Sequence, residues 1–177
     1  VIGVDNLSTR RFAYESGTDS VFPLPSPSER VLEAKRHLDV NVEFIIGDIT
    51  VPGFLKDLIR RTRPDAIVHF AEQRSAPFSM KDEEHAVLTI QNNLIGTMRL
   101  AYAVKEVDPT IHIVKMGTMG EYGTPNFDIP EDIEIEADIN GKKDRILVPR
   151  KGGSWYQWGK VVDTEIRYYG NRRRGFT

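Results

Sequence analysis

Short apolar runs alternate along the chain with segments whose apolar residues recur every three or four positions. The runs at 1–5, 42–46, 66–70 and 111–116 are typical of buried strands. The amphipathic segments between them predict helices over 27–38, 54–63 and 84–104. Strands that alternate with helices indicate crossover connections, so the pattern predicts an α/β fold with a parallel sheet.

Two local signals set the limits of these helices. Ser26-Pro27-Ser28-Glu29 has the form of a capping box with proline at the first helical position. Pro64 ends the second helix, and the polar stretch before Ser26 predicts a loop.

The alternation stops between Gly117 and Gly152. A structureless loop of that length is uncommon in a compact domain, and Asn140-Gly141 between 134–139 and 145–148 predicts an inserted hairpin within about 130–150. A helix follows and ends at Arg172-Arg173-Arg174, where cations suit the negative helix terminus. Residues 175–177 then resemble the start of another strand. We expect one partial domain over 1–177.

Composition excludes several function classes. A net charge of -2 gives no electrostatic case for binding nucleic acid or an anionic membrane. The absence of cysteine excludes disulfides and thiolate metal sites, and the four histidines lack metal-site spacing. His69 and His112 lie in predicted strands and are expected to be core histidines. No apolar stretch is long enough to span a bilayer, so the default expectation is a cytoplasmic protein without a metal.

Tyr156 and Lys160 are the first candidates for chemistry. Four residues apart on a helix, they project from one face. A free phenol has a pKa near ~10, and a close ammonium favours the phenolate, which would let Tyr156 accept a proton. A chance pair on an amphipathic helix is the alternative.

Further polar residues follow the predicted strands, at the sheet edge where ligands bind in open parallel sheets. Asp5 could accept both hydroxyls of an adenine ribose or be a loop acid, and Asp48 could accept the adenine amine or cap a helix. Arg10 and Arg11 could reach a nucleotide or be solvated. Asn92-Asn93 within a helix predicts an inward Asn with a tertiary partner, or a solvent-facing Asn.

Longer motifs add a family resemblance. Val4-Asp5-Asn6, Gly47-Asp48-Ile49, Asn92 to Thr97 and the Tyr156/Lys160 pair resemble the extended short-chain dehydrogenase/reductases, in the NAD-dependent epimerase/dehydratase group. His69 to Pro77 and Gly117 to Pro125 resemble more narrowly the UDP-sulfoquinovose synthases. The resemblance covers nearly the whole chain and implies a Rossmann-type doubly wound sheet.

This resemblance implies a reaction and roles for residues. The synthases hold NAD, oxidise UDP-glucose at C4, remove water across C5 and C6, add sulfite at C6 and reduce C4 again. By motif, Tyr156 removes the C4 hydroxyl proton, Lys160 lowers the pKa of Tyr156 and holds the nicotinamide ribose, and Thr118 binds the C4 oxygen. Gln73 and Arg74 would bind the sugar or sulfite, and Glu121 would transfer a proton at C5 or C6. The residues implied for the NAD site are Asp5, Asn6, Arg10, Asp48, Ile49, Ala71, Asn92, Tyr156 and Lys160.

Several departures from the family pattern matter. The strand and Gly-rich loop expected before Val1 would lie mid-sheet, between the strands at Val1 and Ala66, and a sugar-binding half is expected after Thr177. We therefore expect an internal piece of a longer protein, with a gap in its sheet, that alone binds NAD poorly and is inactive. Whether a transit peptide precedes this sequence is left open.

Gln157 stands where the synthases commonly have His, and Gln cannot shuttle a proton. Gly159 replaces the usual Ser or Thr and weakens the helix by about 1 kcal/mol relative to Ala. The alternatives to a synthase are a UDP-sugar 4-epimerase or 4,6-dehydratase, and a non-catalytic fragment. The resemblance also implies a homodimer formed through the long helices.

Overall fold

The computed structural model describes residues 1–174 of the chain, with side chains through residue 170. The strands are β1 (Ile2–Asp5), β2 (Glu43–Ile46), β3 (Ala66–His69), β4 (His112–Lys115), β5 (Glu134–Ile139) and β6 (Lys142–Leu147). The helices are α1 (Ser8–Glu15), α2 (Pro27–Leu38), α3 (Phe54–Thr62), α4 (Ala76–Ser79), α5 (Glu83–Ile90), α6 (Gly96–Val107) and α7 (Trp155–Arg174), with a π-helical segment η1 (Gln91–Ile95) and a 3₁₀ turn η2 (Met119–Glu121).

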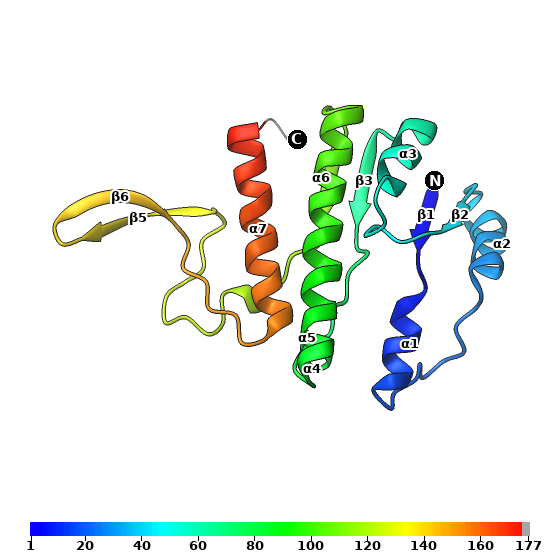
Figure 1. Cartoon of the computed structure of the whole chain (residues 1–177), viewed down its shortest axis with the longest axis horizontal. Coiled ribbons are helices and arrows are strands. Elements are labelled where there is room, and N and C mark those ends of the chain that lie inside the picture. The colour runs from blue at the N-terminus through cyan, green and yellow to red at the C-terminus, as the bar shows by residue number, and fades with distance from the viewer. Residues whose placement is uncertain (175–177) are drawn as a thin grey trace.

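The four central strands form two separate parallel pairs. β1 pairs with β2 from Ile2↔Glu43 onward, and β3 pairs with β4 from Ala66↔His112 onward. Within the described residues no ladder joins β1 to β3, so the expected break between these two strands is confirmed. Figure 1 shows the β1–β2 pair with α1 and α2 on one side of the molecule and β3 beside α6 in the middle.

The apolar core lies on the β3–β4 side. Its buried members come from α3, α6 and the residue before β4: Leu55, Ile59, Leu100, Ala103, Val104 and Ile111. α3 and α6 carry apolar residues at helical spacing, so each buries one face against the other and against the strands. Burying a large aliphatic side chain contributes about 1.5–3 kcal/mol, which makes this cluster the main stabilising unit.

The β1–β2 side is packed much less closely. Neither α1 nor α2 buries a residue fully, and Ile46 on β2 remains 69% exposed. The capping box of α2 is present, with the Ser26 hydroxyl accepting from the Glu29 N–H and the Glu29 carboxylate accepting from the Ser26 N–H. Local hydrogen bonds therefore define α2 more than packing does.

The helix predicted over 84–104 is continuous but changes its winding. α5, η1 and α6 follow one another, and the π-helical segment contains both asparagines. π segments insert one extra residue into a helix and rotate the residues on either side. The Asn93 side chain is thereby fully buried, which settles the choice left open for this pair in favour of an inward Asn.

Two expectations were wrong. Residues 8–15, expected in a polar loop, form α1, whose one-sided apolar residues Phe12 and Ala13 are partly covered. Phe12 packs against Phe78 with tilted rings whose centroids are 4.8 Å apart, a long-range contact that the local sequence does not reveal. His112 is exposed at the start of β4, whereas His69 is buried as expected.

β5 and β6 form the antiparallel hairpin, with Asn140 and Gly141 both at positive φ (56° and 75°) as a two-residue turn requires. The hairpin extends away from the body (Figure 1). The strand expected from 175–177 lies outside the described residues. No helix among those described has the length and apolar content to cross a bilayer.

Candidate functional site

A cleft lies between the two strand pairs, at their carboxyl ends. Its lining residues are Val4, Asp5, Asn6, Ser8, Thr9, Gly47, Ile49, Phe70, Ala71, Glu72 and Asn92. Five positions expected to bind the dinucleotide are therefore brought together: Asp5, Asn6, Ile49, Ala71 and Asn92. The carboxyl edge of parallel strands is the position where ligands bind in such sheets.

Asp48 and Arg10 do not line this cleft. The Asp48 carboxylate accepts hydrogen bonds from the Thr50 N–H and hydroxyl and from the Asn6 amide, 2.6–3.0 Å away. Burial raises the pKa of Asp48, but these hydrogen bonds outweigh it and lower the pKa overall. Arg10 donates to the Tyr14 hydroxyl at 3.0 Å and lies 3.9 Å from Asp19. In this structure Asp48 stabilises the turn that contains it. The Arg10 guanidinium contacts residues close to it in the sequence, Tyr14 and Asp19.

Tyr156, Thr118 and Lys160 converge beside β4. The Tyr156 side chain forms a hydrogen bond with Thr118, and the Lys160 ammonium lies 5.9 Å from the centre of the Tyr156 ring. The Tyr156 N–H donates to Ser79 Oγ at 3.1 Å, which fixes the start of α7 against α4. The phenol, hydroxyl and ammonium that the sequence singles out thus share one site.

The acidity of Tyr156 does not follow the expectation. Burial raises the pKa of the Tyr156 phenol, and the carboxylates of Glu72, Asp163 and Glu121 raise it further, while the hydrogen bond with Thr118 lowers it. Lys160 was expected to lower this pKa, but in this structure the pKa of Tyr156 lies above its ordinary value. The reason is that Lys160 is not isolated from other charges.

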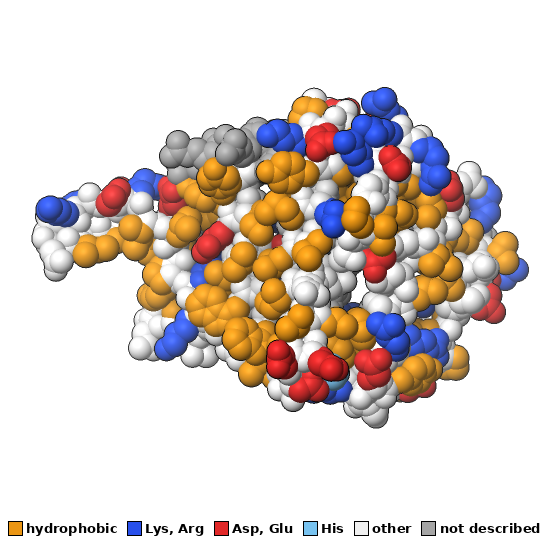
Figure 2. All heavy atoms as spheres, in the orientation of Figure 1, with side chains coloured by type: hydrophobic (Ala, Val, Ile, Leu, Met, Phe, Trp, Pro, Cys, Tyr) orange, Lys and Arg blue, Asp and Glu red, His pale blue; other side chains and the backbone are white. Residues whose placement is uncertain are grey.

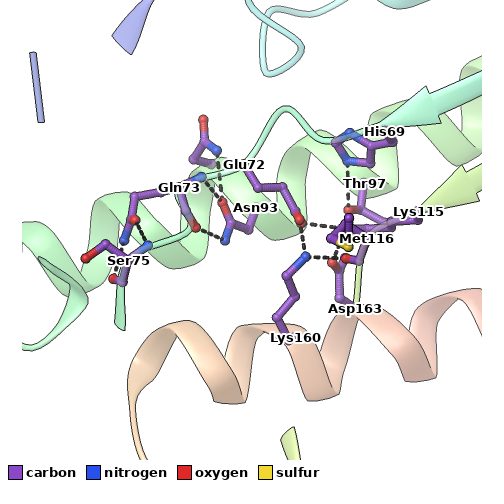
Figure 3. A network of polar contacts seen from close by, with 11 residues as sticks. His69, Glu72, Gln73, Ser75, Asn93, Thr97, Lys115, Met116, Lys160 and Asp163 are labelled. Carbon is purple, nitrogen blue, oxygen red and sulfur yellow. Dashed lines mark hydrogen bonds and ion pairs between the residues drawn. The ribbon is translucent and has the colours of Figure 1, made fainter. Parts of the chain in front are cut away.

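Lys160 belongs to a buried network of four charged side chains (Figure 3). Its ammonium donates to Glu72 Oε2 and, at 2.6 Å, to the Met116 carbonyl. Glu72 Oε1 accepts from Lys115 at 2.5 Å, and Lys115 also pairs with Asp163. All four side chains are 3–4% exposed.

Burial and the neighbouring Lys115 lower the pKa of Lys160, although Glu72 opposes this change. Burial also works against the charged form of Glu72, but Lys115 and Lys160 outweigh it, so the pKa of Glu72 lies below its ordinary value. Sequence reasoning missed Glu72, Lys115 and Asp163 as a group. The available signals were a lysine closing an apolar strand and an acid three residues after Lys160 on the same helix.

Gln73 and Asn93 hold the loop that carries Glu72. The Asn93 amide bonds the Gln73 backbone N–H and carbonyl, both at 2.9 Å. The Gln73 amide donates to Thr89 at 2.8 Å and to the Ser75 carbonyl at 3.0 Å, and Gln73 is only 5% exposed. Both amide hydrogens of Gln73, which was expected to bind substrate, therefore have partners within the protein in this structure.

Arg74 and Glu121, the other two residues expected to act on the substrate, differ in exposure. Arg74 is exposed next to Gln73 and is free of the buried network. Glu121 is buried and lies 3.1 Å from Arg150, an ion pair that lacks the alignment of a hydrogen bond. Glu121 is thus close enough to Tyr156 to affect its pKa but is paired with a guanidinium.

Gln157 and Gly159, the two residues of α7 that depart from the family pattern, have structural explanations. Gln157 Oε1 accepts from the Gly153 N–H at 2.6 Å, and its side chain packs so closely on Gly120 that a Cβ there would lie 2.4 Å from Gln157 Nε2. A Cβ at Gly159 would lie 3.2 Å from Ile90 Cδ1. Gln157 therefore braces the loop that holds Thr118, and Gly159 allows α7 to approach α5.

A sequence model of the family described as GDP-mannose 4,6 dehydratase matches residues 24–137. The chain belongs to this family. The match includes α2, β2, β3, β4 and the loop of Thr118. β1 and α7, which carry Asp5, Tyr156 and Lys160, lie outside it.

Curated relatives agree with the narrower resemblance. The chain is 64% identical over all 177 residues to a UDP-sulfoquinovose synthase of Sulfolobus acidocaldarius, of which it covers 45%. It is 43% identical over 161 residues, 91% of this chain, to a chloroplastic UDP-sulfoquinovose synthase of Spinacia oleracea, of which it covers 33%. The resemblance to these synthases is confirmed, and the chain spans less than half the length of either relative.

A solved structure supports the fold. UDP-glucose 4-epimerase of Bifidobacterium longum, determined with NAD+ and UDP, matches all of this chain and 43% of its own with a TM-score of 0.67 at 18% identity. The fold is therefore the expected α/β Rossmann type.

Proposed function

We propose that this chain forms the dinucleotide-binding and catalytic part of an NAD-dependent enzyme that converts UDP-glucose and sulfite to UDP-sulfoquinovose. The observation that carries the proposal is the convergence of Tyr156, Thr118 and Lys160 beside the cleft. Similarity to curated synthases supports this reaction over the others of the family.

The cleft has the features that a dinucleotide requires. Asp5 provides a carboxylate at a strand end, and the small residues Gly47 and Ala71 allow close approach to the backbone. Asn6, Ile49 and Asn92 would complete the binding surface, and Lys160 would reach the nicotinamide ribose. When bound, NAD supplies the acceptor and later the donor of the hydride at C4.

The side chains of this chain would accept and donate the protons of the reaction. The Tyr156 phenolate takes the C4 hydroxyl proton, and Thr118 holds the C4 oxygen through its hydroxyl. The ketone at C4 acidifies the C5 proton, so water leaves across C5 and C6 and sulfite adds to the resulting conjugated bond. Glu121 is the candidate for proton transfer at C5 or C6. The raised pKa of Tyr156 favours the phenol, which is the form that returns a proton to the C4 oxygen when the ketone is reduced.

Product analysis tests this proposal. A protein that carries this sequence within the full length of its relatives should form a sulfonated sugar nucleotide from UDP-glucose, NAD and sulfite, detected by mass spectrometry. Formation of the C4 epimer alone would reject the synthase and favour a 4-epimerase.

The exposed Arg74 separates the two reactions further. A guanidinium binds oxyanions through paired donors, so a synthase that uses Arg74 for sulfite should lose sulfite-dependent turnover in Arg74→Ala. A 4-epimerase or 4,6-dehydratase should stay largely active. Lys35→Ala, a change in an exposed residue of α2, is the matched control.

We also propose a homodimer formed by α6 and α7. Figure 2 shows hydrophobic side chains gathered over these helices. The exposed apolar residues at helical spacing are Ile95, Met98, Tyr102, Trp155, Trp158, Val162 and Tyr169. An apolar stripe of this kind is typical of an interaction surface. Sedimentation should show that Trp158→Glu, but not Leu38→Glu, shifts a dimer to monomer.

A further inference from the structure

The buried network places two ammonium groups and two carboxylates in alternation. The sequence of contacts is Lys160–Glu72–Lys115–Asp163 (Figure 3). Lys115 is the central cation, because it contacts both acids while Lys160 contacts only one of them. In their ordinary protonation states the four side chains sum to zero charge.

This balance matters because the network adjoins Tyr156. Lys160 and Asp163 lie four and seven residues after Tyr156 on α7, and so share its face. A charge within a few ångströms shifts a pKa by about 1–3 units in a site without water. Without Lys115, the three remaining groups would leave one net negative charge beside the phenol.

We propose that Lys115 and Asp163 are positioning residues for Tyr156 and Lys160. Together they hold Glu72 against Lys160 and keep the net charge beside the phenol at zero, so that the phenolate can form. The inference rests on the proposed function for its purpose but concerns the acidity of Tyr156, which can be measured without turnover.

The groups that face this region come from every surrounding element. They are Glu72 after β3, His69 on β3, Lys115 on β4, Thr118 and Glu121 at η2 with Arg150 paired to Glu121, and Lys160, Asp163 and Arg167 on α7. His69 stays neutral near pH 7 because burial lowers its pKa to about 3. Glu121 is offset by Arg150, and Arg167 keeps the same charge in every variant described below, so these variants differ only in the charge of the four-membered network.

Tyrosine titration, without substrate, in a protein that carries this sequence at the full length of its relatives tests the proposal. Ring-carbon NMR of isotopically labelled tyrosine gives the apparent ionisation constant of Tyr156, assigned by the signal lost in Tyr156→Phe. Asp163→Asn removes one negative charge while Lys115 keeps Glu72 as partner. The ionisation constant of Tyr156 should rise by about tenfold or more. Adding Lys115→Met to Asp163→Asn restores neutrality and should return the constant to within about threefold of the parent value.

A purely structural role predicts a different pattern. If Asp163→Asn leaves the ionisation constant within about threefold of the parent, the proposal is overturned. It is also overturned if the double variant keeps the full change of the single one. Because no substrate is involved, inactivity toward UDP-glucose would reject the proposed function and leave this measurement valid.

Discussion

The two strand pairs of this molecule differ in how their residues are held. On the β3–β4 side, α3, α6 and α7 bury an apolar core and a polar network, so Thr118, Tyr156 and Lys160 are fixed by contacts from several elements. On the β1–β2 side the helices bury no residue fully, and the side chains of Asp5 and Asn6 are positioned by hydrogen bonds at exposed sites: from the Leu7 and Ser8 N–H groups, and between Asn6 and Asp48. The groups proposed for chemistry therefore lie in the closely packed half, while one wall of the cleft comes from the loosely packed half.

Truncation of apolar side chains should show the largest difference in stability between the two strand pairs. Ile59 is 2% exposed and Leu38 is 71% exposed. Ile59→Ala should lower the free energy of unfolding by about 2–5 kcal/mol because it leaves a cavity. Leu38→Ala should change it by no more than about 0.5 kcal/mol. Urea unfolding measures both, and equal losses would contradict the contrast between the halves.

Removal of the Asn93 amide should have the next largest effect on stability. Asn93→Ala leaves the backbone N–H and carbonyl of buried Gln73 without partners, and an unsatisfied buried group costs about 1–3 kcal/mol. Asn92→Ala, in the adjacent position, is the control and should cost less. If both variants unfold at the same urea concentration, Asn93 does not hold the Glu72 loop as described.

His69 should make the stability of the closely packed half depend on pH. Burial lowers the pKa of His69 from 6.5 to about 3, so between these values the unfolded chain binds a proton that the folded chain does not. Stability from this residue is complete above about pH 6.5 and falls as the pH drops, by about 1.4 kcal/mol per pH unit. The parent chain should lose stability more steeply than His69→Gln when urea unfolding is repeated from neutral to acidic pH. Parallel curves would mean that folding does not lower the pKa of His69.

The smallest loss of stability is expected from a substitution in the loosely packed half. Ser26→Ala removes the cap of α2 and should cost about 1 kcal/mol. Amide exchange should accelerate in α2 and stay unchanged in α6, because little tertiary packing connects them. Ser28→Ala, two residues on and exposed, is the matched control and should leave both helices unaffected.

The sequence predicted most of the fold but only part of the site. The capping box, the four strands and the Asn140-Gly141 turn depend on local patterns, and all were found where the pattern indicated. α1 was missed because its stabilising contact, Phe12 on Phe78, joins segments far apart in sequence.

The electrostatics of the site could not be predicted for a similar reason. Spacing placed Tyr156 and Lys160 on one helical face, but the partners of Lys160 come from the loop after β3 and from β4. The direction of the Tyr156 pKa depends on those partners. The π-helical segment that buries Asn93 likewise depends on tertiary contacts with Gln73.

Formation of reduced nicotinamide tests the central claim most directly. A protein that carries this sequence at the full length of its relatives, loaded with NAD, should show the near-ultraviolet absorbance of reduced nicotinamide when UDP-glucose is added without sulfite. That signal should disappear when sulfite is supplied, and its formation should be at least about 10²-fold slower in Tyr156→Phe. Tyr156→Phe forming the signal at the parent rate would contradict the account.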